Sequence, residues 1–277
     1  MRWWPAPAKL NLFLHVLARR ADGYHELQTA FQLLELCDDI GVEPREDEHI
    51  ERVAGPAGVA AHEDLVVRAA RALQASTGSC RGARLHVRKR IPLGGGLGGG
   101  SSDAATVLLV LNRLWGTGLD LDDLADIGLT LGSDVPIFVH GSSAWAEGRG
   151  ERLTAVQLPP RWFLVVHPAV AVSTAQVFQA PELTRNSPVI TIRAFFEGRT
   201  RNDCEDVVRA KYPAIADALD WLGQYAPARL TGTGSCIFAS FERAADAERI
   251  AARVPDQWRC FVARGLNRSP LHAALLD

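Results

Sequence analysis

The sequence predicts a mixed α+β protein with two lobes, and three observations lead to this expectation. Strand-like and helix-like segments follow one another without the regular rhythm of a doubly wound parallel sheet. Apolar residues make up 47% of the 277 residues, which is enough for a sizeable core. Pro159 and Pro160 form the clearest boundary signal in the chain, so we expect an N-terminal domain at 1–158 and a C-terminal domain at 159–277.

Extended segments open the chain. Residues 8–17 alternate over part of their length and predict a strand, and Asp22-Gly23 is typical of a hairpin turn. Residues 25–36 then form a second extended run. The polar segment 44–58 contains proline and glycine, so we expect a loop with an edge strand there.

Helices and strands then alternate to the end of the chain. Helical spacing of apolar residues predicts helices at 64–76, 104–114, 121–132 and 244–253, and one or two more within 204–225. Asp120 is expected to cap the helix that follows it. The expected strands are 84–91, the strands and turns of 142–157, the buried strand and exit of 162–172, the glycine turn within strands at 229–241, and 260–264.

The composition excludes several classes of protein. A formal net charge of −2 argues against nucleic acid as a partner. The five cysteines show no C-x-x-C spacing, which suits a reducing cytoplasm and indicates no metal framework. No apolar run approaches the ~18 residues of a membrane span, and the first residues do not resemble a signal peptide. We therefore expect a cytoplasmic protein without a membrane partner.

The most informative segment is a glycine-rich run, I-P-L-G-G-G-L-G-G-G-S-S-D-A-A, between Ile91 and Ala105. Glycine loses more conformational freedom on folding than other residues, so its six glycines indicate a role for the backbone itself. Backbone N–H groups can surround an anion here, and the N-terminus of the following helix favours phosphate. A strand-like run and an apolar helix frame the segment, which favours a phosphate-binding loop over a flexible linker.

Three kinds of phosphate-binding loop are candidates for this run. The P-loop requires a Gly-Lys pair, and the chain contains none. The dinucleotide pattern is matched formally, but the acidic residues near position 120 lie in a helix-entry pattern rather than at the end of a strand. The third kind is a nucleotide loop closed by hydroxyls, in which Ser101 or Ser102 caps the helix, donates to phosphate or binds magnesium. Asp103 is expected in the first helical turn, where the helix dipole favours it, rather than as a catalyst.

Five segments together resemble the GHMP kinase superfamily: P-A-K-L-N-L-F-L, A-D-G-Y-H-E-L-Q-T, P-L-G-G-G-L-G-G-G-S-S-D-A-A, G-S-D-V-P-I-F and L-T-G-T-G-S-C. The similarity extends from residue 7 to residue 272. The first two segments point to members that phosphorylate a small-molecule cytidylyl diphosphate in non-mevalonate isoprenoid biosynthesis. The resemblance implies a two-lobed GHMP kinase fold. Its N-terminal lobe is ribosomal-protein-S5-like and binds ATP, its C-terminal lobe is ferredoxin-like, and the active site lies in the cleft.

The resemblance also implies where ATP binds and which residues act in catalysis. The ATP-binding residues are Pro92, Leu93, Gly94, Gly95, Gly96, Leu97, Gly98, Gly99, Gly100, Ser101 and Ser102. Phosphoryl transfer to an alcohol usually needs a carboxylate that takes the proton, and Asp134 is the candidate. From the residues alone, its Ser-Asp-x-Pro setting fits a helix cap or turn equally well. Lys9 would otherwise be a solvated lysine, but the matching lysine of the family keeps the aspartate ionised.

The substrate is expected to contact a second set of residues: Asn11, Tyr24, His25, Phe178, Gly232, Thr233 and Gly234. The resemblance implies that Tyr24 and Phe178 stack on the two faces of cytosine while His25 meets its polar edge. From the residues alone, a packed aromatic at a hairpin and an ordinary glycine hairpin fit these segments too. Asn11 lies two residues beyond Lys9, so it shares a strand face with that lysine.

Several assignments stay open at this point. Asn202 and Asp203 match the family and are either structural or supports of the active site. Asp64 stands where many relatives carry an asparagine near the nucleotide base, which leaves its role in adenine binding open. Lys89 is either a neighbour of ATP or a solvated charge. Mg²⁺ is expected to come with ATP, since no carboxylate cluster predicts a dedicated metal site, and the protein is expected to be a monomer or weak homodimer.

Two other functions compete with that of a small-molecule kinase. An ATP-dependent decarboxylase of diphosphomevalonate is expected to lack the A-D-G-Y-H segment, which this chain contains. A non-enzymatic sensor on the same fold is expected to lose Asp134 or Lys9, and both are present. The kinase therefore fits best, and the resemblance alone implies that the hydroxyl phosphorylated is the 2-hydroxyl.

Overall fold

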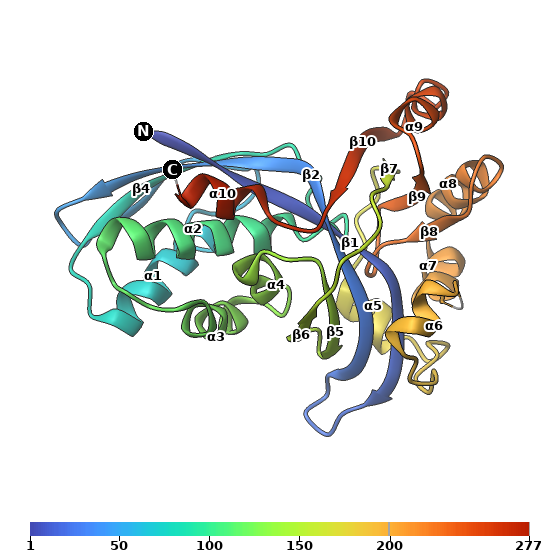
Figure 1. Ribbon diagram of the computed structural model, residues 1–277, viewed down its shortest axis with the longest axis horizontal. Coiled ribbons are helices and arrows are strands. Elements are labelled where there is room, and N and C mark those ends of the chain that lie inside the picture. The colour runs from blue at the N-terminus through green and yellow to red at the C-terminus, as the bar shows by residue number, and fades with distance from the viewer. Residues whose placement is uncertain (199, 277) are drawn as a thin grey trace.

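Two long antiparallel strands, β1 (Arg2–Arg19) and β2 (His25–Arg45), connect the two lobes (Figure 1). The computed structural model describes residues 1–198 and 200–276. Both strands are longer than the sequence predicts, because Arg2 to Pro7 pair with Val42 to Cys37 along one continuous ladder. Pairing along the ladder therefore decides the strand ends more strongly than the local sequence does.

The second edge of β2 binds three different strands in succession. Residues 27–31 pair with β5 (Ala144–Gly148), residues 33–34 with β10 (Arg259–Leu266), and residues 39–45 with β4 (Gly82–Arg88). The remaining strands are β3 (Ile50–Ala54), β6 (Arg152–Ala155), β7 (Trp162–His167), β8 (Ala228–Leu230) and β9 (Ile237–Phe241). The sheet runs in the order β3-β4-β2-β10-β7-β9-β8, so β2 and β10 join the lobes.

The first four helices of the described chain belong to the N-terminal lobe, where two of them pack on the sheet and the other two pack mainly on helices. They are α1 (Leu65–Thr77), α2 (Gly99–Trp115), α3 (Leu121–Leu131) and α4 (Val135–His140). Helix α2 lies at the centre, with its apolar residues from Ala104 to Leu111 buried in the core. Asp120 caps α3 as predicted, since its Oδ1 accepts the Asp123 N–H at 2.9 Å.

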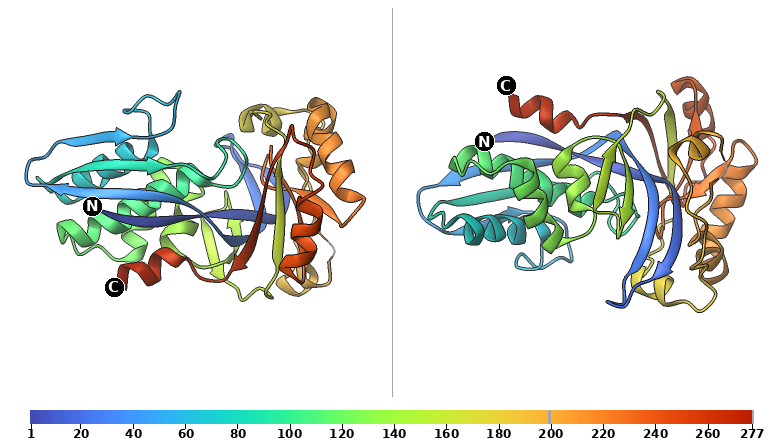
Figure 2. Two further views of the ribbon diagram at one scale, coloured as in Figure 1. Left: turned by 90° about the horizontal axis from the view of Figure 1, so that it is seen from above. Right: turned by 60° about the horizontal axis from the view of Figure 1, so that its bottom comes forward.

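Among the described residues, the C-terminal lobe contains five helices of 5 to 11 residues, drawn in yellow to red in Figures 1 and 2. They are α5 (Thr174–Gln179), α6 (Ile192–Phe196), α7 (Glu205–Lys211), α8 (Pro213–Gly223) and α9 (Ala244–Ala251). The last helix, α10 (Pro270–Leu276), returns to the N-terminal lobe, where Leu271 is buried in the core. The predicted boundary at 158/159 lies between β6 and β7 and stays a prediction.

A buried apolar seam joins the two lobes. Ala8 and Leu10 of β1 and Leu97 of the glycine run pack against Phe163 and Phe238 of the C-terminal lobe. Their side chains are at most 4% exposed. This packing holds the neighbours of Leu10 in β1 at the junction of the lobes.

The mixed α+β prediction is confirmed, and the main differences concern short helices. Helix α2 begins at Gly99 rather than at Ala104, inside the glycine run itself. Helices α4, α5, α6 and α10 were not predicted, because five to seven residues carry too little apolar periodicity to be recognised. Along the described ranges, the helices are too short or too polar to cross a membrane.

Candidate active site

Strand β1 presents a buried lysine at the junction of the lobes. Lys9 is 3% exposed, and its Nζ lies 3.2 Å from Oδ2 of Asp134. The same ammonium donates to Oδ1 of Asn11 at 2.6 Å and to the Gly96 carbonyl at 2.9 Å. Because a buried ammonium needs partners for its N–H groups, these three contacts define the position of the cation.

Asp134 stands immediately before α4, at the position of a helix cap. Its side chain makes no capping hydrogen bond and pairs with Lys9 instead. The side chain of Asp134 is 31% exposed and that of Lys9 only 3%, and both residues line the same cleft. The backbone of Asp134 therefore begins α4, whereas its carboxylate makes no bond to the helix and pairs with Lys9.

Asn11 is held on both its backbone and its side chain. Its N–H donates to Oγ1 of Thr231 at 2.9 Å, and its Nδ2 donates to Oγ1 of Thr29 at 3.0 Å. Its Oδ1 accepts from Lys9. Asn11 is 4% exposed, so in this structure its amide orients Lys9 directly.

The two glycine turns lie against each other, one from each lobe. The Cys236 N–H donates to the Gly95 carbonyl at 3.0 Å. Gly96 has φ of +75°, and a Cβ atom on it would lie 2.4 Å from the carbonyl oxygen of Thr231. Only glycine therefore permits this approach of the two turns.

Neither serine of the glycine run caps α2. The N-cap is Gly98, with φ of +72°, and it supplies no side-chain hydrogen bond. Ser102 is fully buried, and its Oγ has no partner within the described residues. Ser101 is partly exposed, and its Oγ lies 3.8 Å from where a Cβ on Gly132 would be, two residues before Asp134. Of the two hydroxyls, Ser101 is therefore the one on the side of Asp134.

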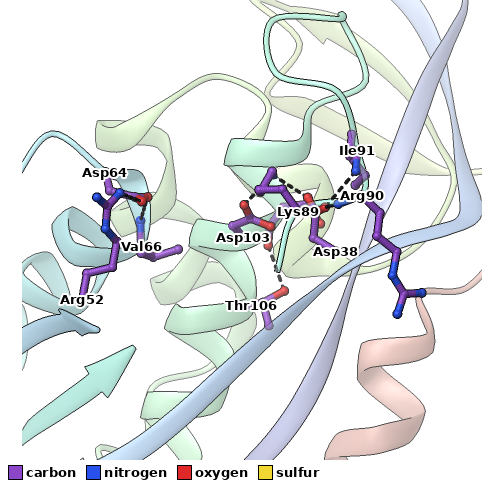
Figure 3. Close-up of polar contacts among 10 residues, drawn as sticks. Asp38, Arg52, Asp64, Val66, Lys89, Arg90, Ile91, Asp103 and Thr106 are labelled. Carbon is purple, nitrogen blue, oxygen red and sulfur yellow. Dashed lines mark hydrogen bonds and ion pairs between the residues drawn. The ribbon is translucent and has the colours of Figure 1, made fainter. Parts of the chain in front are cut away.

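A charged triad of the buried Asp38 and Asp103 and the half-buried Lys89 lies at the two ends of the glycine run (Figure 3). Nζ of Lys89 donates to Oδ2 of Asp38 and, at 2.7 Å, to Oδ2 of Asp103. Oδ1 of Asp38 accepts the N–H groups of Arg90 at 2.6 Å and Ile91 at 2.9 Å. Lys89 is therefore not a solvated charge. Asp103 lies beyond the first turn of α2, so the prediction of a dipole-favoured first-turn residue is wrong.

Burial is the main influence on the ionisation of this triad. It raises the pKa of Asp103 to about 8, against the opposing effect of Lys89. Burial acts to lower the pKa of Lys89, but the carboxylates of Asp103 and Asp38 outweigh it and raise that pKa. Lys89 therefore stays charged, while Asp103 is the member of the triad that can carry a proton near neutral pH.

Asp64 has a structural role in this chain. Its Oδ1 accepts the Val66 N–H at 3.1 Å, which caps α1, and its Oδ2 pairs with Nη1 of Arg52 (Figure 3). Both carboxylate oxygens thus have partners within the protein. Capping and ion pairing therefore account for an aspartate at this position.

A group of aromatic rings lies beside the cleft. The rings of His25 and Phe178 are stacked, with centroids 5.0 Å apart and planes at 24°. Nε of Arg185 donates to Nε2 of His25 at 3.2 Å, so the ring proton resides on Nδ1. Burial and then Arg185 lower the pKa of His25, which keeps the imidazole neutral. Tyr24 is exposed, and the guanidinium of Arg149 lies 4.8 Å from its ring centroid.

These groups surround a cavity of about 180 Å³ between the lobes. It is lined by the predicted residues Lys9, Asn11, Gly96, Gly98, Asp134, Phe178, Gly232 and Thr233. Tyr24 and His25 lie outside this lining and reach it only through Arg149 and Phe178. Residues that sequence reasoning missed also line it: Leu14, Leu27, Thr29, Phe31, Ser133, Arg149, Gly150 and Thr174. The glycines around Arg149 were a turn signal, but nothing local placed that turn at the cleft.

Asn202 and Asp203 support the site from behind. Nδ2 of Asn202 donates to the carbonyls of Leu230 at 2.9 Å and Gly232 at 2.8 Å, which orients the second glycine turn. Oδ2 of Asp203 accepts the Val16 N–H at 2.7 Å and so binds β1 to the C-terminal lobe. Both residues act on backbone, the first of them close to the cleft. Within the described ranges, no three His, Cys, Asp or Glu side chains are grouped to hold a metal ion.

Comparisons with known proteins agree on one family. The GHMP kinases N terminal domain matches residues 64–142, and the GHMP kinases C terminal domain matches residues 185–260. A 4-diphosphocytidyl-2-C-methyl-D-erythritol kinase of Halorhodospira halophila is 59% identical, over 99% of this chain and 96% of that protein. One of Pseudomonas aeruginosa is 53% identical, over 98% of this chain and 96% of that protein.

Solved structures give the same result. A crystal structure of 4-(cytidine 5'-diphospho)-2C-methyl-D-erythritol kinase superposes with a TM-score of 0.84 at 35% identity, over 95% of this chain and 99% of that one. A mevalonate kinase structure, at 14% identity and a TM-score of 0.71, shares the fold over 97% of this chain and 100% of that one. The predicted GHMP kinase fold is confirmed, and the chain belongs to the GHMP kinases, in the family of the 4-diphosphocytidyl-2-C-methyl-D-erythritol kinases.

Proposed function

We propose that this enzyme transfers the γ-phosphate of ATP to the 2-hydroxyl of 4-diphosphocytidyl-2-C-methyl-D-erythritol, giving the 2-phosphate and ADP. The observation that carries the proposal is the contact of Lys9 with Asp134, 3.2 Å apart, at a cleft bounded by two glycine turns. Relatives named as 4-diphosphocytidyl-2-C-methyl-D-erythritol kinases match nearly the whole chain, which supports the same substrate here.

ATP is placed on the first glycine run, from Pro92 to Ser102. The N-terminus of α2 has no side-chain cap, so its first N–H groups are available for phosphate oxygens. A Cβ on Gly94 would meet nothing within 4 Å, so the backbone there is open to a ligand. This combination of an open backbone and a helix N-terminus suits a triphosphate.

Asp134 acts as the base in the transfer. Its carboxylate takes the proton as the O–H bond of the substrate breaks, and the freed oxygen attacks the γ-phosphorus of ATP. A new P–O bond forms while the bond from the γ-phosphorus to the β,γ-bridging oxygen breaks, and ADP leaves. Lys9, held by Asn11 and Gly96, keeps a positive charge next to the carboxylate and the developing alkoxide.

The cytidylyl end is placed toward Phe178 and its stacked partner His25. His25 offers an N–H at Nδ1, which suits an acceptor on the edge of cytosine, and Tyr24 supplies a second aromatic surface. We assign the substrate diphosphate to Arg149. Its guanidinium lines the cleft between Tyr24 and the catalytic pair, and guanidinium groups bind phosphate oxygens well.

Mg²⁺ is proposed to come with ATP and to be held mainly by phosphate oxygens. The residues fit this arrangement, because Asp134 already pairs with Lys9 and the described residues offer no carboxylate cluster. When bound, the ion supplies neutralisation of phosphate charge. We also propose that the enzyme works in the cytoplasm, as a monomer or weak homodimer.

The function is tested by measuring ADP release with the purified enzyme and three acceptor conditions. We expect turnover with 4-diphosphocytidyl-2-C-methyl-D-erythritol and none with diphosphomevalonate or without an alcohol. Product phosphorylated on the 2-hydroxyl should be visible by phosphorus NMR. Carbon dioxide release from diphosphomevalonate would support the decarboxylase instead, and ATP binding without turnover of any acceptor would support a sensor.

A further inference from the structure

A second cavity, of about 360 Å³, shares no lining residue with the catalytic cleft. Leu12 of β1 forms one wall, directly after Asn11 in the chain. Phe163 of β7 and Phe238 of β9 line it from the C-terminal lobe, and Phe195 of α6 lines it from another side. The cavity is larger than the catalytic cleft, and none of its lining residues is used in the proposed reaction.

Arg229 of β8 brings a positive charge to this aromatic cavity. Its Nη1 donates to the Leu12 carbonyl at 2.9 Å and to Oγ1 of Thr200 at 2.8 Å. Among the described residues, Nε and Nη2 of Arg229 donate to no protein acceptor. The guanidinium therefore has two kinds of N–H group left for a ligand in the cavity.

No described carboxylate forms an ion pair with Arg229. Glu205 offsets the charge only from farther away, and its Oε2 instead accepts the Leu230 N–H at 3.0 Å. Burial lowers the pKa of Arg229, yet a guanidinium stays protonated in proteins. A half-buried cation without a paired anion is unfavourable, and an anionic ligand would relieve that cost.

We propose that this cavity is a second binding site, for a small anion that carries a flat apolar body. The carboxylate or phosphate binds Arg229, and the apolar body packs against Phe163 and Phe238. Arg161, at the rim, adds positive charge, although its Nη1 already pairs with Glu242 at 3.2 Å. Charge complementarity therefore selects an anion, and the aromatic lining selects its body.

The site is linked to the catalytic residues through two short paths. Arg229 holds the carbonyl of Leu12, whose neighbour Asn11 orients Lys9. Thr231, two residues after Arg229, accepts the N–H of the same Asn11. A ligand that draws Arg229 toward itself thus acts on both sides of Asn11.

The test is calorimetric titration of the full chain with phenyl phosphate, benzoate and inorganic phosphate. A non-hydrolysable ATP analogue at saturation occupies the first anion site throughout. We expect phenyl phosphate or benzoate to bind at millimolar concentration or below, and inorganic phosphate to bind at least ~10-fold more weakly. The tighter of the two aromatic probes identifies the charged group that the site prefers.

Three variants decide the location. Arg229→Met removes the cation, and Ser240→Trp fills the cavity from its exposed edge on β9 while keeping Arg229. Both should weaken binding of the aromatic probe at least ~10-fold. Arg249→Gln, on the exposed surface of α9, should leave it unchanged. The proposal is overturned if the native enzyme binds neither aromatic probe, if inorganic phosphate binds equally well, or if Ser240→Trp binds normally.

Discussion

At the scale of single residues, the site depends on a lysine that is buried and fully partnered. Lys9 donates to Asn11 and Gly96 and faces Asp134, so its charge is kept where water is largely excluded. In such surroundings a fixed charge acts more strongly than it does in water. The more exposed Asp134 is left as the group that a substrate hydroxyl can reach.

Replacing Asp134 tests this division of roles. Asp134→Asn keeps the shape of the side chain but cannot accept the substrate proton, so kcat should fall by ~10²-fold or more. The thermal unfolding midpoint should change little, because the carboxylate makes no capping bond. Steady-state ADP release and a melting curve check both points. Normal turnover by a folded variant would exclude Asp134 as the base.

Arg149 gives a second prediction at this scale. Arg149→Gln should raise KM for the cytidylyl substrate by ~10-fold, since a charged hydrogen bond contributes about 1.5–3 kcal/mol. KM for ATP should stay unchanged, because ATP is proposed to bind the glycine run at 92–102 and not Arg149. Arg193→Gln, on the exposed surface of α6, is the matched control. Equal changes in both KM values would argue against a contact with the substrate diphosphate.

At the scale of elements, the two glycine turns require contact between backbones. Gly94 and Gly96 both have positive φ, at +66° and +75°, so alanine strains both positions. Only at Gly96 would the new Cβ also meet a carbonyl oxygen, that of Thr231 at 2.4 Å. The comparison of the two alanine variants therefore isolates the packing of one turn on the other.

We expect Gly96→Ala to lower kcat/KM by at least ~10-fold more than Gly94→Ala, since the clash also displaces the carbonyl that binds Lys9. Kinetics of both variants, with circular dichroism to verify folding, provide the measurement. If Gly94→Ala proved the more damaging change, the open backbone at Gly94 rather than the contact of the turns would be decisive.

The charged triad predicts a dependence of stability on pH. Burial raises the pKa of Asp103 to about 8, whereas an unfolded aspartate titrates near ~3.9. Between these values the folded state holds a proton that the unfolded state has lost. The free energy of unfolding should therefore decrease as pH rises, by at most ~1.4 kcal/mol per pH unit from this group.

Asp103→Asn removes the titrating group and keeps an amide of similar shape. The free energy of unfolding of the variant, minus that of the native protein, should increase from about pH 5 to about pH 8, as measured by urea unfolding. Asp122→Asn, on the exposed surface of α3, should show no such trend. A constant difference between Asp103→Asn and the native protein across this range would contradict the raised pKa.

At the scale of the whole molecule, the lobes share strands as well as a core. β1 and β2 extend through both lobes, β10 links β2 to β7, and α10 returns to the N-terminal core (Figures 1 and 2). The seam around Leu10 is buried from both sides. Neither lobe can therefore expose its part of the sheet without disturbing the other.

We expect thermal unfolding to be a single cooperative transition, with equal calorimetric and van't Hoff enthalpies. Leu10→Ala should destabilise the protein by about 2–5 kcal/mol and shift that one transition as a whole, because it opens a cavity at the seam. Differential scanning calorimetry measures both effects. Two separate transitions, with only one shifted by Leu10→Ala, would mean that the lobes unfold independently.

Local patterns in the sequence sufficed for the fold class, the family and the prediction that the glycine run binds phosphate. These depend on periodicity and on motifs that are local in the chain, such as the capping residue Asp120 and the glycines from 94 to 100. The proposed roles of Lys9 and Asp134 come from the resemblance, since no local pattern distinguishes a catalytic lysine from a solvated one.

Tertiary structure alone decided which side chains meet. Lys9 and Asp134 are 125 positions apart in the sequence. They meet only because β1 crosses the junction of the lobes next to the start of α4. Packing also brings Arg149 to the cleft. It likewise places Asp64 at the start of α1 as a cap, and Lys89 between two aspartates. Contacts between distant segments depend on how the whole chain packs. The local periodicity of one segment predicts its secondary structure but not the distant residues that it contacts.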